Sequence, residues 1–202
     1  MATADTDEHL LHRLARGDAA SFEQLFLRHY ATVYRVAYGL VGRRDVAEDL
    51  AQDTFLQLYR RPPLQRDSIS LPAWLCRVVL NRGHNALRTE RRAGTREERV
   101  AIQERSTGGE WSDPEAAALR NEQQNRVRDA LAQLPERQMK LLLLRNAGLP
   151  YAEIAQLLDV APGSVGTLLA RAGRAFQEAY GRSERTQTAA VSHAEREPQL
   201  ET

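Results

Sequence analysis

The sequence predicts an all-α protein, built from two small helical domains that a flexible linker joins, with a helix-turn-helix in the second. The helix-forming residues Ala, Leu, Arg, Glu and Gln dominate the 202-residue chain, and runs of β-branched residues are absent. Apolar residues recur at helical spacing between Gly, Pro and Asp residues. The stretch at 93–113 is rich in Gly, Ser, Thr and mixed charges and has few apolar side chains to bury. We therefore expect domains at 1–92 and 114–182, a linker at 93–113 and a disordered tail at 183–202.

Composition and charge narrow the functional class. The formal net charge is +1, so the chain does not coat nucleic acid uniformly, and any nucleic-acid contact must come from locally clustered Arg residues. A lone cysteine, Cys76, allows no disulfide within the chain and is expected to be buried. The acidic, polar N-terminus is unlike a signal peptide, and no apolar run has membrane-spanning length. We expect a cytoplasmic protein without membrane insertion.

The first two expected helices are bounded by residues that typically start or stop a helix. A short amphipathic helix is expected over Asp5–Arg16, with Gly17 stopping it. A longer helix starts at Asp18 and has Gly42 as its left-handed cap. Together they supply apolar faces for a first core.

The third helix is predicted to begin at Asp45, with Glu48 completing a capping box, and to break at Pro62. Its polar face is acidic: Glu48, Asp49, Gln52 and Asp53. The carboxylates have no accompanying His, so a metal site is disfavoured. The sequence therefore indicates an exposed acidic face, which can dock a basic partner surface.

The fourth helix is predicted to open at Pro72, after the polar loop Pro62–Leu71. Steps of three and four residues place five polar side chains in one stripe: Arg77, Asn81, His84, Arg88 and Arg91. A basic stripe at a helix end fits a nucleic-acid surface. A solvated helix end that the macrodipole favours explains the same charges equally well.

The second half begins with helix starts at Asp113–Glu115 and Leu134–Glu136, and Gly148 ends the second of these helices. Two helices then follow within Leu149–Tyr180, joined by the tight turn Asp159–Ala161. The second of them opens with Pro162. We expect Gly181 to close it.

That last helix has two opposite stripes. One is apolar (Val165, Leu168, Leu169, Ala172 and Phe176), and the other is polar (Ser164, Thr167, Arg171, Arg174 and Glu178). This is the pattern of a DNA-binding helix-turn-helix whose second helix enters a major groove. A helical hairpin packed in a core is the alternative.

Three blocks together resemble the bacterial RNA polymerase sigma factors of the ECF (extracytoplasmic function) group. They are Ala47–Arg60, Ala73–Arg88 and Leu131–Ala172. A lone helix-turn-helix would not separate a sigma factor from a repressor, whereas all three blocks in this order, with this linker, are specific.

The resemblance implies a role for each block. The Ala47–Arg60 helix resembles the segment that docks on the coiled coil of the polymerase β′ subunit, with matching positions Glu48, Asp49, Gln52, Asp53 and Phe55. The Pro62–Leu71 loop and fourth helix resemble the reader of the −10 promoter element, with positions Arg77, Asn81, His84, Asn85, Arg88 and Arg91. The last helix resembles the −35 reader, with positions Pro162, Gly163, Ser164, Gly166, Thr167, Arg171 and Arg174.

The implied partners are core RNA polymerase (β′ and β subunits), promoter DNA and a cognate anti-sigma factor. No catalytic activity and no cofactor are implied. The sequence itself agrees with this expectation, because it contains no Gly-rich phosphate loop, metal-ligand cluster or nucleophile–base pair. The family's linker threads the polymerase cleft, and 93–113 is similar to it.

Several positions depart from the family pattern. Asn85 stands at a position where the family commonly has Asp. Asp159 stands at the turn position where the family commonly has Gly, but Asp tolerates the left-handed conformation that this position needs. Pro150 and Ala161 replace Ser or Thr caps. Gly166 and Leu169 replace the usual polar residues, which bears on the −35 sequence that is read.

A one-component helix-turn-helix regulator, acting without polymerase docking, is the alternative function. The pairing of the acidic helix with the basic helix in the first half argues against it.

Overall fold

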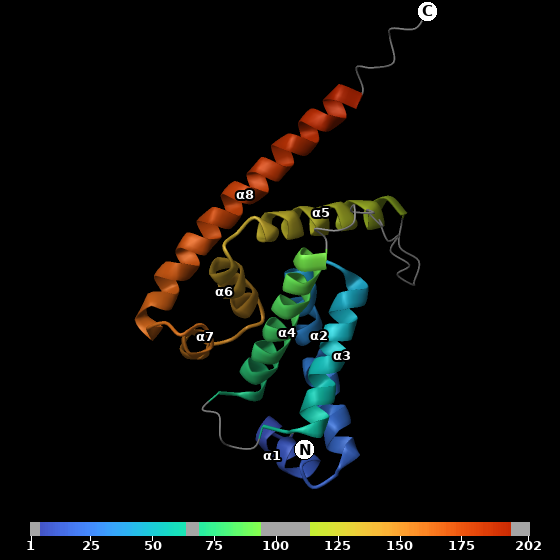
Figure 1. Cartoon of the computed structure of the whole chain (residues 1–202), viewed down its shortest axis with the longest axis vertical. Helices are drawn as coiled ribbons and strands as arrows, with labels where there is room; N and C mark the ends of the chain where they lie inside the picture. Colours follow the sequence, from blue (N-terminus) through green and yellow to red (C-terminus); the bar gives the residue numbers. More distant parts are fainter. Residues whose placement is uncertain (1–4, 64–68, 94–113, 195–202) are drawn as a thin grey trace, which may run out of the picture.

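The structure is a computed structural model that describes residues 5–63, 69–93 and 114–194. These residues form helices and contain no strand, which confirms the all-α expectation. The α-helices are α1 (Asp7–Leu14), α2 (Ala19–Val41), α3 (Arg44–Arg60), α4 (Leu71–Ala93), α5 (Pro114–Ala132), α6 (Glu136–Asn146), α7 (Tyr151–Leu158) and α8 (Val165–Ala194), and a short 3-10 turn, η1 (Pro162–Ser164), precedes α8 (Figure 1).

The first half is a bundle in which α2 packs against α1, α3 and α4. Its helix ends follow the local signals. The side chain of Asp18 accepts a hydrogen bond from the Ala20 amide at 3.0 Å, and α2 ends at Gly42, whose φ is 71°. Gly17, with φ of 91°, follows α1. All three boundary signals are as predicted, because a capping side chain and a left-handed glycine act within a few residues of the chain.

The capping box predicted at Asp45 is wrong. Helix α3 begins one residue earlier, at Arg44, and its N-cap Arg43 makes no side-chain cap hydrogen bond. Arg43 Nη2 instead donates to the Asp45 carboxylate at 2.6 Å, and this pairing lowers the pKa of Asp45. The ion pair therefore takes the carboxylate that the capping box would have used.

In the second half, α8 packs against α5, α6 and α7. The turn between α7 and α8 is left-handed at Asp159, with φ of 51°, as predicted. Pro162 opens the 3-10 turn η1 rather than the α-helix itself. Gly148, with φ of 86°, follows α6.

The expectation that Gly181 closes the last helix is wrong. Helix α8 continues to Ala194, and Gly181 is not among the described glycines with a positive φ. One Gly inside a helix costs about 1 kcal/mol relative to Ala, which a long helix tolerates. Residues 183–194 of the expected disordered tail are therefore helical, and residues 195–202 lie outside the described part.

The two halves lie against each other. Helix α4 has α2 and α3 on one side and α6 and α7 on the other (Figure 1), and α7 contacts it directly. Helices α5 and α6 also contact α2. The buried apolar residues of both halves form one contiguous cluster. The expected linker, 93–113, lies outside the described residues apart from Ala93, which ends α4.

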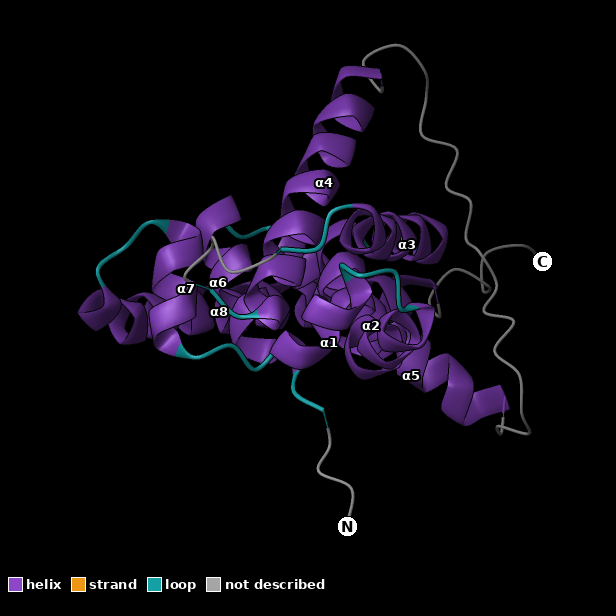
Figure 2. Cartoon of the chain, turned by 90° about the horizontal axis from the view of Figure 1, so that it is seen from below, coloured by secondary structure: helices purple, strands orange, loops and turns teal. Residues whose placement is uncertain are grey.

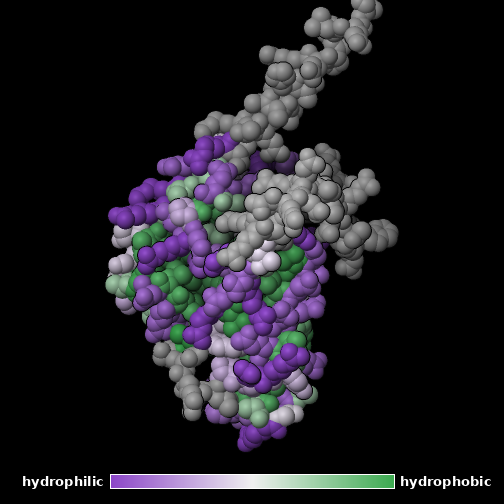
Figure 3. Space-filling view, in the orientation of Figure 1, coloured by the Kyte–Doolittle hydropathy of each residue, from purple (hydrophilic) through white to green (hydrophobic). Residues whose placement is uncertain are grey.

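Helix α8 runs past the packed body and extends away from it, and the view from below shows α5 projecting as well (Figures 1 and 2). On the face seen in Figure 3, hydrophilic residues predominate and hydrophobic residues show in patches across the body. Within the described ranges, no helix combines the length and hydropathy needed to cross a membrane.

Candidate nucleic-acid and protein interfaces

The acidic face of α3 is exposed as predicted. Four of the expected docking residues, Glu48, Asp49, Gln52 and Asp53, lie on the surface. Phe55 does not: it is 1% exposed and packs edge-on against Phe26, with ring centroids 4.8 Å apart. Its position argues against direct contact with a partner and gives it the role of holding α3 on α2.

Two exposed apolar residues on α3 were missed by the sequence reasoning. Leu56 is 42% exposed and Tyr59 is 52% exposed. They follow Gln52 at steps of four and three residues, so they share its side of the helix. That spacing could have identified them, because a large apolar residue on a polar helix face often marks a contact surface.

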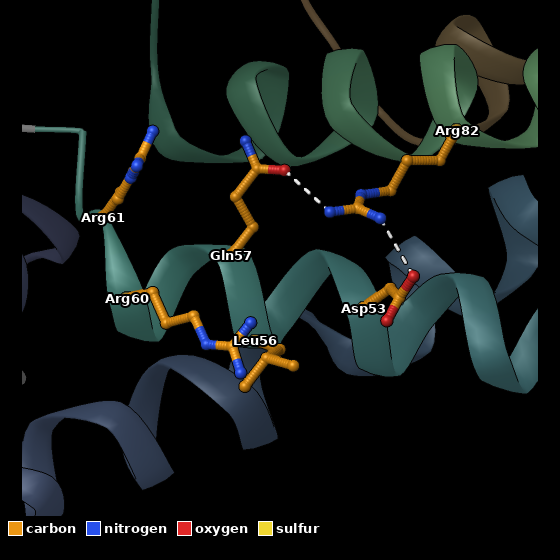
Figure 4. A pocket seen from close by; sticks show the side chains of 6 residues that line it. All are labelled: Asp53, Leu56, Gln57, Arg60, Arg61 and Arg82. Carbon is orange, nitrogen blue, oxygen red and sulfur yellow. Dashed lines mark hydrogen bonds and ion pairs between the residues drawn. The ribbon is translucent and has the colours of Figure 1, made fainter.

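A cleft of about 500 Å³ lies between α3 and α4. Arg82 reaches across it from α4, donating from Nη1 to Asp53 at 2.9 Å and from Nη2 to Gln57 at 3.1 Å (Figure 4). Arg60 and Arg61 line it as well. Arg82 therefore partly neutralises Asp53, which leaves Glu48 and Asp49 as the stronger acidic part of the face.

The stripe on α4 is only partly accessible. Asn81, Asn85 and Arg88 are exposed, and Arg77 is half-buried. The side chain of His84 is 16% exposed, and its Nε2 lies 3.5 Å from a carboxylate oxygen of Glu136 on α6. The backbone of Arg91 is helical, but its side chain lies outside the described part.

Basic side chains from both halves of the chain surround the Glu136 carboxylate. Lys140 Nζ donates to its carboxylate at 2.6 Å, and this bond lowers the pKa of Glu136, with further contributions from His84 and Arg88. A carboxylate therefore stands among three basic side chains at the edge of the α4 stripe.

The predicted −35 reading residues are all exposed at the start of the last helix. Pro162, Gly163 and Ser164 form η1, and Gly166, Thr167, Arg171 and Arg174 follow on α8. The opposite stripe faces inward, because Val165 and Ala172 are fully buried and Leu168, Leu169 and Phe176 are half-buried. Both stripes of the helix therefore lie as predicted.

A neighbouring pair beside this surface was also missed. The Arg145 guanidinium lies 5.4 Å from the centroid of the Tyr151 ring, which is 44% exposed. A Cβ built at Gly166 would lie 3.8 Å from Tyr151 Cε2, so the ring stands beside the start of α8. The turn at Gly148 brings the pair together, and helical spacing within either helix does not reveal it.

Cys76 and the clusters of titratable side chains are the remaining candidates for chemistry. Burial raises the pKa of Cys76 to about 12, so the thiol is not a nucleophile at neutral pH. No group of three His, Cys, Asp or Glu residues within the described ranges is placed to hold a metal ion.

Two family models match the chain: Sigma-70 region 2 over residues 25–93 and Sigma-70, region 4 over residues 124–175. The chain is similar to the RNA polymerase sigma-H factor of Pseudomonas aeruginosa, with 29% identity over 185 residues, 89% of this chain and 96% of the relative. It is similar to the ECF RNA polymerase sigma-E factor of Haemophilus influenzae, with 30% identity over 178 residues, 85% of this chain and 94% of the relative.

Solved structures share the fold. CnrH in complex with the cytosolic domain of CnrY matches with a TM-score of 0.63 and 22% identity, over 86% of this chain and 96% of that one. The sigma factor RpoE of Bartonella quintana, in complex with the anti-sigma factor NepR, matches with a TM-score of 0.57 and 24% identity. The match covers 78% of this chain and 95% of that one. With both regions present in order and its relatives covered almost end to end, the chain belongs to the ECF group of bacterial RNA polymerase sigma factors.

Proposed function

We propose that this chain binds core RNA polymerase, directs it to promoters with −35 and −10 elements and helps to open the −10 element. The observation that carries the proposal is the placement of the polar surfaces within the matched regions. The acidic face of α3 and the stripe of α4 lie within region 2, and the exposed start of α8 lies within region 4. The chain has no catalytic activity of its own in this proposal, and the polymerase performs the chemistry.

The acidic face of α3 is the proposed docking surface for the β′ subunit. Glu48 and Asp49 provide negative charge that a basic partner surface complements. Leu56 and Tyr59 extend the face with apolar area, which adds to affinity once water is excluded. Phe55 supports the helix from beneath.

The stripe on α4 is the proposed contact for the melted −10 strand. Asn81 and Asn85 carry amides that donate to and accept from base edges, and Arg88 suits a phosphate or a stacked base. Capture of an unstacked base would favour the open form of the element.

The start of α8 is the proposed −35 reader. Ser164 and Thr167 carry short hydroxyl groups, and Arg171 has the reach for a base edge or a phosphate in the major groove. The Arg145–Tyr151 pair stands beside this surface, and we propose that Arg145 contacts a flanking phosphate.

We further propose that a cognate anti-sigma factor regulates the chain. The proposal is supported by two relatives of the same fold, which were solved in complex with CnrY and with the anti-sigma factor NepR.

The test is transcription with purified core polymerase on a genomic promoter library, with and without the chain. The expected result is initiation from a restricted promoter set only when the chain is added. Duplex binding by the chain alone, without any polymerase-dependent initiation, would favour a one-component regulator instead.

A further inference from the structure

We propose that the cleft between α3 and α4 binds a nucleoside diphosphate. The cleft has a volume of about 500 Å³, and small-molecule sites usually measure about 300–1,000 Å³. The site itself does not depend on the proposed function, but its consequence for polymerase docking rests on that function. Within the described residues, the cleft is lined by Asp53, Leu56, Gln57, Arg60, Arg61 and Arg82.

The lining of the cleft carries an excess of positive charge. Among the described lining residues, three guanidinium groups face one carboxylate, that of Asp53. The carbonyl end of α3 also lies here, because Arg61 is the C-cap of that helix, and it adds a partial negative charge of roughly half a unit. The guanidinium groups outweigh both, so the cleft attracts an anion.

Two of the three guanidinium groups are available to a ligand. Arg60 and Arg61 are exposed, and neither makes a hydrogen bond or an ion pair with another residue in the described part of the chain. Their charges are therefore not yet matched by a carboxylate.

The third guanidinium group, that of Arg82, is held loosely. Its ion pair with Asp53, at 2.9 Å, is open to solvent, because the two side chains are 38% and 55% exposed. Such a pair contributes little to stability, so a phosphate can take the guanidinium from the carboxylate. In addition, Arg82 Nε is buried without a hydrogen-bond partner among the described residues, and a phosphate acceptor in the cleft would remove that penalty.

The arrangement of the polar groups suits two linked phosphates. Figure 4 shows Gln57 between Arg61 and Arg82, in the space that separates α3 from α4. Gln57 and Arg61 lie one helical turn apart, about 5 Å along the axis. One phosphate group can accept from Arg82 and the Gln57 amide while the next accepts from Arg61. Contacts of this kind between Arg and phosphate are charge-assisted and frequently bidentate.

The remaining wall of the cleft suits a nucleoside. Arg60 lies beside Leu56 in Figure 4, and Leu56 is 42% exposed. A planar base would cover apolar area on Leu56, and the flat Arg60 guanidinium can stack on an aromatic ring. Neither contact depends on the identity of the base. Inorganic diphosphate has no group for this wall and should bind more weakly.

A nucleic-acid strand carries phosphates as well, but the cleft is offset from the stripe on α4. Arg82 follows Asn81 directly, so it lies about 100° around the helix from that residue. A strand lying along Asn81 and Asn85 would therefore run past the cleft, whereas a nucleoside diphosphate fits inside it.

Occupancy of the cleft bears on polymerase docking. Asp53 and Leu56 line the cleft and also belong to the proposed docking face of α3. A ligand in the cleft covers both, so the ligand and the β′ subunit compete for the chain. Under the proposed function, the ligand lowers the fraction of the chain that is bound to polymerase.

The first test is binding to the purified full-length chain. ADP, GDP and inorganic diphosphate are titrated by isothermal titration calorimetry, without divalent metal and in a buffer free of phosphate and sulfate. We expect one site per chain, with a Kd below about 0.1 mM for ADP and GDP and a Kd about tenfold weaker or more for inorganic diphosphate. Absence of saturable nucleotide binding would overturn the proposal.

A pair of double variants locates the site. Arg60→Gln with Arg61→Gln removes two charges from the cleft, and Arg16→Gln with Arg35→Gln removes two charges from exposed positions elsewhere. The cleft variant should bind ADP and GDP about tenfold more weakly or worse, because it lacks charge-assisted hydrogen bonds, and the control should match the parent. Both should unfold like the parent.

Two results would overturn the assignment to the cleft. One is equal weakening of nucleotide binding in the two double variants. The other is binding of a single-stranded −10 oligonucleotide that depends on Arg60 and Arg61 while ADP and GDP do not bind, which would assign the cleft to DNA.

The competition is tested with core polymerase and a labelled chain. Saturating GDP should weaken docking of the parent severalfold, and docking of the cleft variant should not respond to GDP. The variant thereby separates the cleft from nucleotide sites on the polymerase. Undiminished docking of the parent in saturating GDP would overturn the competition. A chain that binds GDP but never the polymerase would refute the proposed function instead and leave the cleft site standing.

Discussion

Arg171 is the clearest single residue with which to examine −35 recognition. It is exposed on α8, opposite the buried Val165 and Ala172, so its replacement leaves the packing intact. Arg171→Ala should weaken −35 binding by about 1–3 kcal/mol if the guanidinium contacts a base. Holoenzyme binding to promoters with systematically varied −35 sequences measures both affinity and preference.

The outcome separates two kinds of contact. Relaxed preference at one base position identifies base readout, and uniform weakening identifies a phosphate contact. An unchanged affinity and preference would remove Arg171 from the reading surface.

Asp49 tests the docking surface at the same scale. Asp49→Asn removes one exposed charge on α3 and Asp49→Arg reverses it, so core polymerase affinity should fall in that order, and more strongly at low salt. Competition binding against a labelled sigma factor at two salt concentrations is the measurement. The thermal unfolding of both variants should match the parent, and equal polymerase affinity across the three proteins would contradict the docking assignment.

At the scale of elements, the crossing of α2 and α4 depends on a buried glycine. A Cβ built at Gly83 would lie 2.4 Å from Leu40 Cδ2, whereas one built at Gly173 on α8 would meet nothing within 4 Å. We expect Gly83→Ala to cost about 1–3 kcal/mol of unfolding free energy through overpacking. Gly173→Ala should gain roughly 0.5–1 kcal/mol, because Ala is the better helix former.

Urea unfolding of the two variants and the parent measures both changes. The pair is informative because the chemical substitution is identical and only the surroundings differ. A gain in stability at both sites would mean that α2 and α4 move apart at little cost.

The far end of α8 can be examined by truncation. The last buried residue on this helix within the described side chains is Ala179, and Arg182 Nη2 donates to Gln133 Oε1 at 3.3 Å. Removing residues 183–202 should therefore leave the melting temperature and promoter-specific transcription unchanged. A marked loss of either would show that this part of α8 makes a contact that matters, with the polymerase or within the chain.

At the scale of the whole molecule, the fit between the halves can be measured with two glycines. Gly17 and Gly42 both have positive φ, at 91° and 71°, so Ala strains the backbone at either by about 1–2 kcal/mol. Only at Gly42 would the new Cβ also meet another element, lying 2.0 Å from Arg128 Cδ. Gly42→Ala should therefore cost about 1 kcal/mol more than Gly17→Ala, because the hydrogen bond that Arg128 Nη1 donates to the Gly42 carbonyl is lost as well.

Denaturant unfolding of the two variants supplies that comparison. Equal losses of stability would mean that the contact between α5 and α2 contributes little to the folded state of the free chain.

Most of the features that depend on neighbours in sequence could be predicted. The cap at Asp18, the left-handed ends at Gly42 and Asp159, and the two stripes of α8 each depend on signals within a few residues. Local signals fail where a competing interaction exists. Asp45 pairs with Arg43 instead of capping α3, and Gly181 lies within a helix that continues past it.

The sequence by itself determined the helical class, the order of the helices, the family and most of the exposed residues of the three surfaces. The tertiary structure alone decided the burial of Phe55, the pairing of Arg82 with Asp53 and the contact of Ser70 with Glu153. The physical reason is the range of the interactions. Periodicity and capping act over one or two turns of helix, whereas Ser70 and Glu153 are 83 positions apart and meet only because two apolar faces pack into one core.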